Sequence, residues 1–343
     1  MRITVVGGGV IGLSCAWRLA QHGAQVTLHD SAPEAREASW AAAGMLAPHH
    51  EAERADPLWH LGVASLARWA DFAAELHTPL DFHQRGGLIA AITPADGETL
   101  TAKQDFATRH GIACTRLSRA ALLTHEPRLT GCREALLLPG AQVNPRALTS
   151  ALRVACAAAG VRLCYGSTVT TLAGLRERTD LTVLASGAWT PALASLAGLD
   201  LPGEPVKGQL LRFAAPDGLL RHFIHCHHAY LVPRAGAGVV VGSTMTLSGF
   251  DKTEDPAAIA QLAANARDLL PALRDAPILE TWTGLRPRLA SGLPLIAKVR
   301  PDLVIATGHF RNGILLTPIT ASAVVELCDG PPCGVDLLPF SHP

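Results

Sequence analysis

The sequence predicts a mixed α/β protein in which a doubly wound, Rossmann-like domain is combined with a second domain built on an antiparallel sheet. Two patterns support this prediction. Residues 2–30 read as a strand–turn–helix–strand unit, and residues 205–289 alternate short apolar runs with turns. A chain of 343 residues, of which 48% are hydrophobic, is also long enough and apolar enough to bury two cores.

The N-terminal unit begins with an apolar run, residues 3–6, and continues with glycines on the G-x-G-x-x-G spacing at Gly7, Gly9 and Gly12. Gly7 would allow the tight turn out of the strand, and Gly9 would let a pyrophosphate approach the backbone at the positive end of a helix. Gly12 would let that helix pack closely on the strand. The predicted helix ends at Gly23, a residue that suits the left-handed C′ position.

A second apolar strand, residues 25–29, leads to Asp30. A carboxylate at this position would accept hydrogen bonds from the ribose of an adenosine. Because strand, glycines, helix and acid follow in the right order, the unit indicates dinucleotide binding, although it does not say which dinucleotide. The alternative is an ordinary glycine-rich turn followed by a capping aspartate.

Composition excludes several classes of partner. Lys+Arg and Asp+Glu are balanced at 29 each, and no basic run occurs, so neither a nucleic-acid partner nor stable membrane association is expected. Glycines interrupt the N-terminal apolar run, and no run reaches the roughly 18 residues of a membrane span. The 8 cysteines are scattered without a C-x-x-C pair, which is typical of reduced, buried thiols in a cytoplasmic protein.

The segment after the N-terminal unit introduces the second domain. Residues 38–46 are rich in small side chains, and they could lie flat against a planar ligand or begin an ordinary alanine-rich helix. We expect an amphipathic helix over residues 58–76, a strand over residues 87–92, and a short helix over residues 119–124 with Ser118 as its N-cap.

The nucleotide-binding pattern resumes near residue 140. Asn144 suits the N-cap of a helix that has Pro145 at its first position, and a strand is expected over residues 161–165. A further apolar strand, residues 181–184, ends in small residues, as the strand of a parallel sheet does beside a ligand.

The C-terminal half first changes pattern and then returns to it. The expected elements are strands over residues 206–213, 230–233, 239–243 and 279–282, a helix over 256–270 capped by Asp255, a strand over 303–306, a glycine-flanked loop over 307–314, and a helix over 318–328. The chain therefore divides into a dinucleotide-binding domain and a second domain, each made of separated segments. The dinucleotide-binding domain comprises residues 1–80, 140–204 and 290–343, and the second domain comprises residues 81–139 and 205–289.

Beyond the N-terminal glycines, five motifs are spread over nearly the whole chain. They are Ala41-Ala-Ala-Gly-Met-Leu with Glu51 soon after, Pro205-Val-Lys-Gly, His228-Ala-Tyr230-Leu-Val-Pro-Arg234, Thr283-Gly-Leu-Arg286-Pro, and Gly308-His-Phe-Arg-Asn-Gly-Ile-Leu-Leu316. The last two are the most specific. Together these motifs resemble the D-amino-acid oxidase-like family of FAD-dependent oxidoreductases, and within it the glycine oxidases of thiamine biosynthesis.

The resemblance implies that the first domain binds FAD and the second binds substrate. At the matching positions it assigns Val10, Ile11, Asp30 and Ser31 to the ADP half, Val169 to the adenine, Ala38 and Ser39 to the diphosphate region, Ala43, Gly44 and Met45 to one side of the isoalloxazine, and Gly308, His309, Phe310, Arg311, Asn312, Gly313, Ile314 and Leu315 to a loop around that ring. Where the family shows Thr or Ser, this chain has Ala38 and Trp40, which puts side-chain contacts there in doubt. Related enzymes with covalent flavin use a cysteine beyond the Gly-Leu-Arg-like segment. Residues 288–299 contain none, so a non-covalent FAD is expected.

For the substrate, the resemblance places Arg286 on the carboxylate of an amino acid, where a guanidinium can form a bidentate pair that lysine cannot copy. Tyr230 would add a hydroxyl donor to the same carboxylate, and Arg311 would close the amine side. His228 would lie near the substrate. Taken by themselves, these residues could equally be a salt-bridging strand arginine, a strand aromatic and a brace of the loop.

A run of histidines precedes Tyr230. The sequence predicts that His225, Cys226, His227 and His228 alternate along a strand, so half of them would face away from the substrate. No complementary carboxylate or distant ligand pattern accompanies the run, so no metal site is expected there.

The function that the resemblance implies is oxidative deamination of glycine, sarcosine or small D-amino acids through an imine to the 2-oxo acid, with O2 reduced to H2O2. The nearest alternative is an amine or D-amino-acid dehydrogenase of the same fold that passes electrons to a quinone or carrier. A NAD-dependent dehydrogenase and a non-catalytic nucleotide-binding protein are further alternatives. The sequence leaves open the preferred substrate and whether the chain forms a homo-oligomer.

Overall fold

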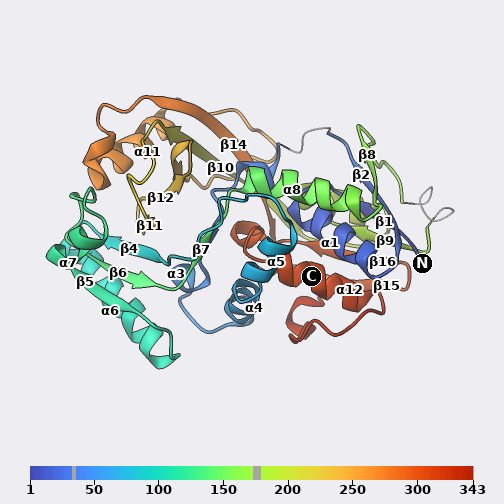
Figure 1. The fold of residues 1–343 in the computed structure, drawn as a ribbon. Coiled ribbons are helices and arrows are strands. Elements are labelled where there is room, and N and C mark those ends of the chain that lie inside the picture. Colours follow the sequence, from blue (N-terminus) through green and yellow to red (C-terminus); the bar gives the residue numbers. More distant parts are fainter. Residues whose placement is uncertain (33–35, 173–178, 343) are drawn as a thin grey trace.

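The computed structural model describes residues 1–32, 36–172 and 179–342, and its strands form two large sheets (Figure 1). Among these residues, the first sheet has strand order β15–β16–β9–β1–β2–β8. Its strands are β1 (Arg2–Val6), β2 (Gln25–Asp30), β8 (Arg162–Tyr165), β9 (Leu181–Leu184), β15 (Leu295–Arg300) and β16 (Leu303–Thr307). β1 pairs in parallel with β2 and β9, whereas β15 runs antiparallel to β16 at one edge. The Rossmann-like arrangement is thereby confirmed.

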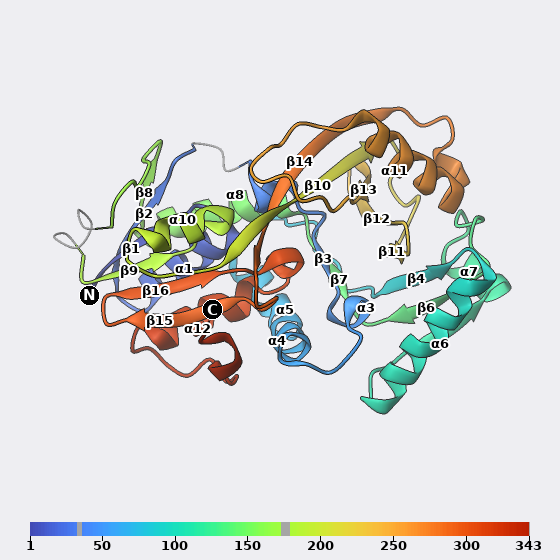
Figure 2. The same cartoon turned by 180° about the vertical axis from the view of Figure 1, so that it is seen from behind.

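Helices cover both faces of this sheet. On one face lie α1 (Val10–Gln21), α8 (Pro145–Ala158) and α12 (Thr317–Leu327), as Figure 1 shows, and on the other lies α10 (Thr190–Ser195), which is in front in Figure 2. The core between β1 and α1 is apolar and inaccessible to solvent, since Val5 and Leu13 are both 0% exposed.

Two of the predicted helix ends are confirmed. Asn144 caps α8, since its Oδ1 accepts a hydrogen bond from the amide of Arg146 at 3.1 Å, and Pro145 is the first helical residue. At the end of α1, Gly23 has φ +84°, the left-handed conformation that favours glycine.

The second sheet is mainly antiparallel, as predicted. Its order is β14–β10–β13–β12–β11–β4–β6–β5. The strands are β4 (Gly87–Ala91), β5 (Thr115–Ser118), β6 (Glu134–Leu138), β10 (Gly203–Phe213), β11 (Phe223–Cys226), β12 (Ala229–Arg234), β13 (Gly238–Gly242) and β14 (Ile278–Leu289). One junction is parallel, because β11 runs in the same direction as β4 and thereby joins the two chain segments of this sheet.

Helices also pack on the second sheet, and several short elements occur between the longer ones. The helices are α6 (Pro94–Arg109), α7 (Arg119–His125) and α11 (Pro256–Leu269). The short elements are α2 (Ala38–Ala41), β3 (Met45–Leu46), α3 (Pro48–Glu51), β7 (Ala141–Gln142), η1 (Gly187–Trp189), η2 (Pro271–Leu273), η3 (Phe310–Asn312) and η4 (Leu338–Phe340). β3 and β7 pair with each other as a two-stranded ribbon.

The single helix expected over residues 58–76 is wrong, because the segment forms two helices, α4 (Pro57–Leu66) and α5 (Trp69–Glu75). Arg68 lies at the break, and its guanidinium donates to the carbonyl oxygens of Ala64 and Cys333 at 2.7 and 2.6 Å. The change of direction buries Trp69 completely. Tertiary contacts of this kind override a continuous amphipathic pattern.

The strand expected over residues 279–282 is much longer. β14 continues to Leu289 because it pairs with β10 along its whole length, with Arg286 opposite Val206. Gly284 and Pro287 obscured this strand in the sequence, because both residues are depleted in strands.

The strands of the six-stranded sheet come from residues 2–30, 162–184 and 295–307, and those of the eight-stranded sheet from residues 87–138 and 203–289. The domain boundaries proposed above stay a prediction. Within the described residues, no helix is both long and apolar enough to cross a lipid bilayer.

Candidate active site

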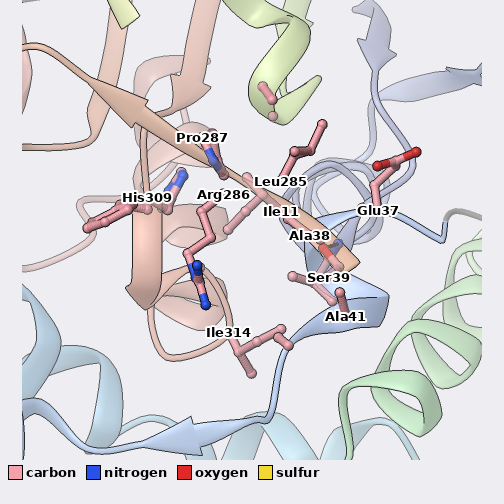
Figure 3. Close-up of a pocket in the computed structure, with 18 of the residues that line it drawn as sticks. Ile11, Glu37, Ala38, Ser39, Ala41, Leu285, Arg286, Pro287, His309 and Ile314 are labelled. Atoms are coloured by element: carbon pink, nitrogen blue, oxygen red, sulfur yellow. Dashed lines mark hydrogen bonds between the residues drawn. The ribbon is translucent and has the colours of Figure 1, made fainter. Parts of the chain in front are cut away.

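A cavity of about 530 Å³ is lined by residues of both large sheets. On one side it receives the carboxyl ends of the parallel strands, including Val6 of β1 and Asp30 of β2, where open α/β sheets bind their ligands. On the other side it receives Tyr230 and Arg286 from the antiparallel sheet. Figure 3 shows Arg286 extending from its strand into the space that Ile314 also borders.

The turn between β1 and α1 forms one wall of this cavity. Gly7 has φ +114°, and a Cβ at this position would collide with the backbone oxygen of Ala185. A Cβ at Gly12 would collide with the backbone oxygen of Gly7. α1 then begins after Gly9, which has no side chain to cap the helix, and the Val10 amide donates to the Oγ of Ser39, so the remaining amides of the first turn are available to a ligand in the cavity. This is the geometry by which helix N-termini bind pyrophosphate.

The carboxylate of Asp30 lies beside this turn. Its Oδ2 accepts the amide of Gly8 at 2.5 Å, and its Oδ1 accepts the amide of Ala32 at 2.8 Å. The backbone oxygen of Asp30 accepts the amide of Ser167 at 2.9 Å, which brings the segment containing Val169 to the same end of the cavity. The end of β2 therefore has the polar groups that a nucleoside needs.

The small-residue segment 38–46 lines the cavity and does not form one long helix. Its first part is α2, in which the Oγ of Ser39 accepts the amide of Val10 at 3.1 Å. Its second part runs past Ala43 and Gly44 into β3. Arg234, which is buried, donates a hydrogen bond to the carbonyl oxygen of Ala43.

The loop from residue 309 to residue 314 forms another wall of the cavity. Phe310 has φ +47°, an uncommon conformation for an aromatic residue. Arg311 forms an ion pair with Glu51 of α3, with 2.6 Å between Nη2 and Oε2. The His309 Nε2 lies 3.0 Å from the Oγ1 of Thr320 in α12, and burial lowers the pKa of His309 to about 4. His309 is therefore neutral at pH 7.

Arg286 is held in place before any substrate arrives. Its Nη2 donates to the Oγ of Ser243 at 2.6 Å, and its Nη1 donates to the backbone oxygen of Thr244 at 3.2 Å. The guanidinium lies over Gly208 of β10, where a Cβ would collide with it. A guanidinium has five N–H donors in all, so donors remain for a carboxylate.

Most of the predicted site residues line this one cavity. They are Gly7, Gly9, Val10, Ile11, Asp30, Ser31, Ala38, Ser39, Ala43, Gly44, Met45, Val169, His228, Tyr230, Arg286, His309, Phe310, Arg311, Asn312, Gly313 and Ile314. Gly12, Gly308 and Leu315 are not among the lining residues. Leu315 is buried, and its carbonyl oxygen accepts hydrogen bonds from Ser65 and Trp69.

The expected alternation of the histidine run along one strand is wrong, because β11 ends at Cys226. His227 and His228 form the exposed turn to β12, while His225 precedes Cys226 and pairs across to Tyr230. A turn breaks the two-residue period that the sequence pattern assumed. Within the described residues, no group of three His, Cys, Asp or Glu side chains could hold a metal ion.

Sequence reasoning did not assign Ser243, Thr244 or Glu51 to the site. Ser243 stands at the end of an expected strand, but nothing local indicated that it contacts Arg286. In the sequence Glu51 is only part of a motif, because its pairing with Arg311 joins residues 260 positions apart. Contacts of this kind depend on the fold.

The cavity fits an extended dinucleotide with a flat ring. The glycine turn and the open N-terminus of α1 suit the pyrophosphate, the end of β2 suits the nucleoside, and the backbone of residues 41–44 offers a surface without large side chains. Together with the Arg286 side chain at the other end of the cavity, these features fit a dinucleotide-dependent enzyme.

Comparison with known proteins specifies the class. The model of a family described as FAD dependent oxidoreductase matches residues 2–327. The chain therefore belongs to this family, and its dinucleotide is FAD.

Relatives that match nearly the whole chain share about a third of its sequence. Glycine oxidase of Geobacillus kaustophilus is 32% identical, with 99% of this chain and 96% of the relative covered. Glycine oxidase of Pseudomonas putida is also 32% identical, with 99% and 98% covered. The bifunctional protein ThiO/ThiG of Nostoc is 34% identical over 95% of this chain and 52% of its own length.

Solved structures agree with the observed fold. The crystal structure of the Geobacillus kaustophilus glycine oxidase superimposes with a TM-score of 0.92 at 31% identity, covering 99% of this chain and 98% of that one. Iminodiacetate oxidase from Chelativorans has the same fold, with a TM-score of 0.88 at 24% identity and 99% and 98% coverage.

Proposed function

We propose that this protein oxidises glycine, or another small amino acid such as sarcosine or a D-amino acid, to an imine that water hydrolyses to the 2-oxo acid. With glycine, the balanced reaction consumes glycine, O2 and water and yields glyoxylate, ammonia and H2O2. The observation that carries the proposal is the guanidinium of Arg286, which is held in the cavity opposite the loop at residues 309–314. Similarity to glycine oxidases along almost the whole chain supports the same reaction.

FAD, when bound, would supply the redox chemistry, namely the two-electron oxidation of the α-carbon and the reduction of O2 to H2O2. The protein residues then have to bind and orient the substrate. Arg286 would hold its carboxylate by two charge-assisted hydrogen bonds, and the hydroxyl of Tyr230 would donate a third. Fixing the carboxylate at two points directs the α-hydrogen, which is the main contribution that a site without an acid–base pair can make.

We further propose that Arg311, through its pairing with Glu51, closes the amine side of the pocket. A guanidinium that is already neutralised by a carboxylate repels a substrate amine less than a free cation does. His228 lies in the exposed turn at residues 227–228, so we assign it to the rim of the pocket.

We propose that residues 1–80, 140–204 and 290–343 form the FAD-binding domain, and that residues 81–139 and 205–289 form the substrate-binding domain. The supporting observation is that the strands of the six-stranded sheet lie in the first set of segments and those of the eight-stranded sheet lie in the second, apart from the first two residues of β10. A role in thiamine thiazole biosynthesis is proposed because several relatives are bifunctional ThiO/ThiG proteins.

The test is to purify the protein and record its absorbance, and then to add glycine while O2 uptake and H2O2 release are followed. We expect flavin bands together with H2O2 equal to the O2 consumed. A panel containing sarcosine, D-alanine and D-proline would rank the substrates. Reduction of an artificial dye without H2O2 would indicate the dehydrogenase alternative, and a spectrum without flavin bands would contradict the proposal.

A further inference from the structure

Four side chains, Trp40, Arg146, Glu280 and Trp282, form a cluster beside the FAD cavity, and we call this cluster the Arg146 clamp. We propose that the Arg146 clamp is a positioning device that holds α2 against the strand bearing Arg286, and so sets the FAD site and the substrate-carboxylate site relative to each other. Its effect on substrate binding rests on the function proposed above.

Arg146 lies in the first turn of α8 and pairs with Glu280 of β14 in a bidentate arrangement. Its Nη1 and Nη2 donate to the two carboxylate oxygens of Glu280, each at 3.0 Å. The guanidinium carbon also lies 3.6 Å from the ring centroid of Trp40 and 4.8 Å from that of Trp282. A planar guanidinium can lie flat on a ring while its edge forms a bidentate pair with a carboxylate, a combination that the compact ammonium group of lysine cannot reproduce.

Trp282 connects this pair to the wall of the FAD cavity. Its Nε1 donates a hydrogen bond of 2.9 Å to the carbonyl oxygen of Ala41, the last residue of α2. Gly284 lies two residues beyond Trp282 on the same strand. A Cβ at Gly284 would lie 2.5 Å from the Cβ of Ala41, so β14 contacts α2 directly. α2 in turn carries Ser39, which accepts the amide of Val10 at the helix end where a pyrophosphate would bind.

The two-residue period of a strand links the clamp to the substrate. Glu280, Trp282, Gly284 and Arg286 occupy alternate positions of β14, so their side chains share one face. Arg286 lies six positions beyond Glu280, which corresponds to about 20 Å of strand, so the Arg146 clamp lies toward one end of this face and the Arg286 guanidinium lies at the other.

β14 is also an edge strand, paired through its backbone only with β10 among the described strands. An edge strand lacks a second neighbour to fix its position, so side-chain contacts on its face have more influence on it. Trp40 stands where the resembled family has Thr or Ser. The clamp gives this departure a physical reason, because a hydroxyl side chain could not stack on Arg146.

The test compares Arg146→Met with a matched control, Arg116→Met. Arg116 forms a similar bidentate pair with Glu134, at 2.8 and 2.9 Å, on β5 and β6 at the opposite edge of the same sheet. The FAD dissociation constant is measured on each apoprotein. KM and kcat for glycine, and the dissociation constant for acetate read from flavin absorbance, are measured on each holoenzyme.

For Arg146→Met we expect the dissociation constants for FAD and acetate and the KM for glycine each to rise about ten-fold, with kcat within about two-fold of wild type. Arg146→Lys should recover thermal stability, because it keeps a positive charge beside Glu280, but it should not recover these constants, because an ammonium group forms neither the bidentate pair nor the planar stack. Arg116→Met should lower the melting temperature only.

If Arg146→Met does not fold, Trp40→Ser removes the closer of the two ring contacts of Arg146 and keeps the ion pair with Glu280, and it should change the same constants. Wild-type affinity for FAD and acetate in either variant would overturn the proposal, as would equal losses in Arg116→Met. A wild-type enzyme that does not oxidise glycine would overturn the proposed function instead. The FAD and acetate constants would still decide the role of the clamp.

Discussion

Arg286 is oriented by the protein itself, through its hydrogen bonds to Ser243 and to the backbone of Thr244. A guanidinium on a free side chain would lose rotational freedom when it bound a carboxylate, and that loss would weaken binding. Holding the group in advance avoids most of this cost. At the scale of single residues, preorganisation of Arg286 is the feature on which the proposed substrate affinity depends.

Replacing Arg286 with alanine should raise the KM for glycine by roughly 10- to 100-fold, because it removes the charge-assisted pairing with the carboxylate, a net contribution of about 1.5–3 kcal/mol. Flavin absorbance should be retained, since the variant leaves the β1–α1 turn intact. Steady-state kinetics and a spectrum of the same sample measure both. Arg288→Ala is the control. Arg288 lies two residues beyond Arg286 on β14, and it pairs with Glu204 of β10. An unchanged KM in Arg286→Ala would remove Arg286 from the site.

Gly208→Ala should also weaken substrate binding, although it leaves Arg286 in the sequence. The added methyl group would meet the guanidinium of Arg286, and the side chain would have to move away from Ser243. A displacement of this kind should raise KM by about 5- to 20-fold with little change in flavin binding. Kinetics on Gly97→Ala provide the comparison, because Gly97 lies in α6 and its added methyl group would meet the Oε1 of Glu134 at 3.1 Å rather than a residue of the cavity. Equal KM values in the two variants would contradict the expectation.

At the scale of elements, the sequence predicted best what is local. The strand, turn and helix at the N-terminus follow from adjacent residues, and the N-caps Ser118, Asn144 and Asp255 were all predicted and are confirmed. β14 was predicted at a third of its length, since its pairing partner lies some 75 residues earlier in the sequence. The hydrogen bond between His309 and Thr320 also depends on the folded position of α12.

The cap of α8 can be tested directly. Asn144→Ala removes the side-chain acceptor for the amides of Arg146 and Ala147, and this should lower the free energy of unfolding by about 1 kcal/mol. Asn144→Ser keeps an acceptor and should recover most of the loss. Urea unfolding of the two variants beside wild type provides the measurement. Equal stability of the alanine and serine variants would mean that the cap does not contribute.

At the scale of the whole molecule, residues of both sheets line the cavity, so the site exists only while both sheets are folded. Two buried histidines near the cavity make the free energy of unfolding depend on pH. Burial lowers the pKa of His50 to about 3 and that of His309 to about 4, from a usual value of 6.5. His50 packs against Phe223 at 4.9 Å between ring centroids, and neither of its ring nitrogens has a hydrogen-bond partner among the described residues.

These lowered pKa values predict a loss of stability in mild acid. Between pH 6.5 and about pH 4 the unfolded chain binds protons at these histidines that the folded chain does not, so the free energy of unfolding falls as the pH falls. Each histidine should contribute roughly 2 kcal/mol of loss between pH 7 and pH 5. His50→Leu removes one of them, so the variant should lose about 2 kcal/mol less than wild type in urea unfolding at the two pH values. His342→Leu, at an exposed position, should keep the wild-type difference. If His50→Leu has the same pH dependence as wild type, His50 is not held neutral by burial.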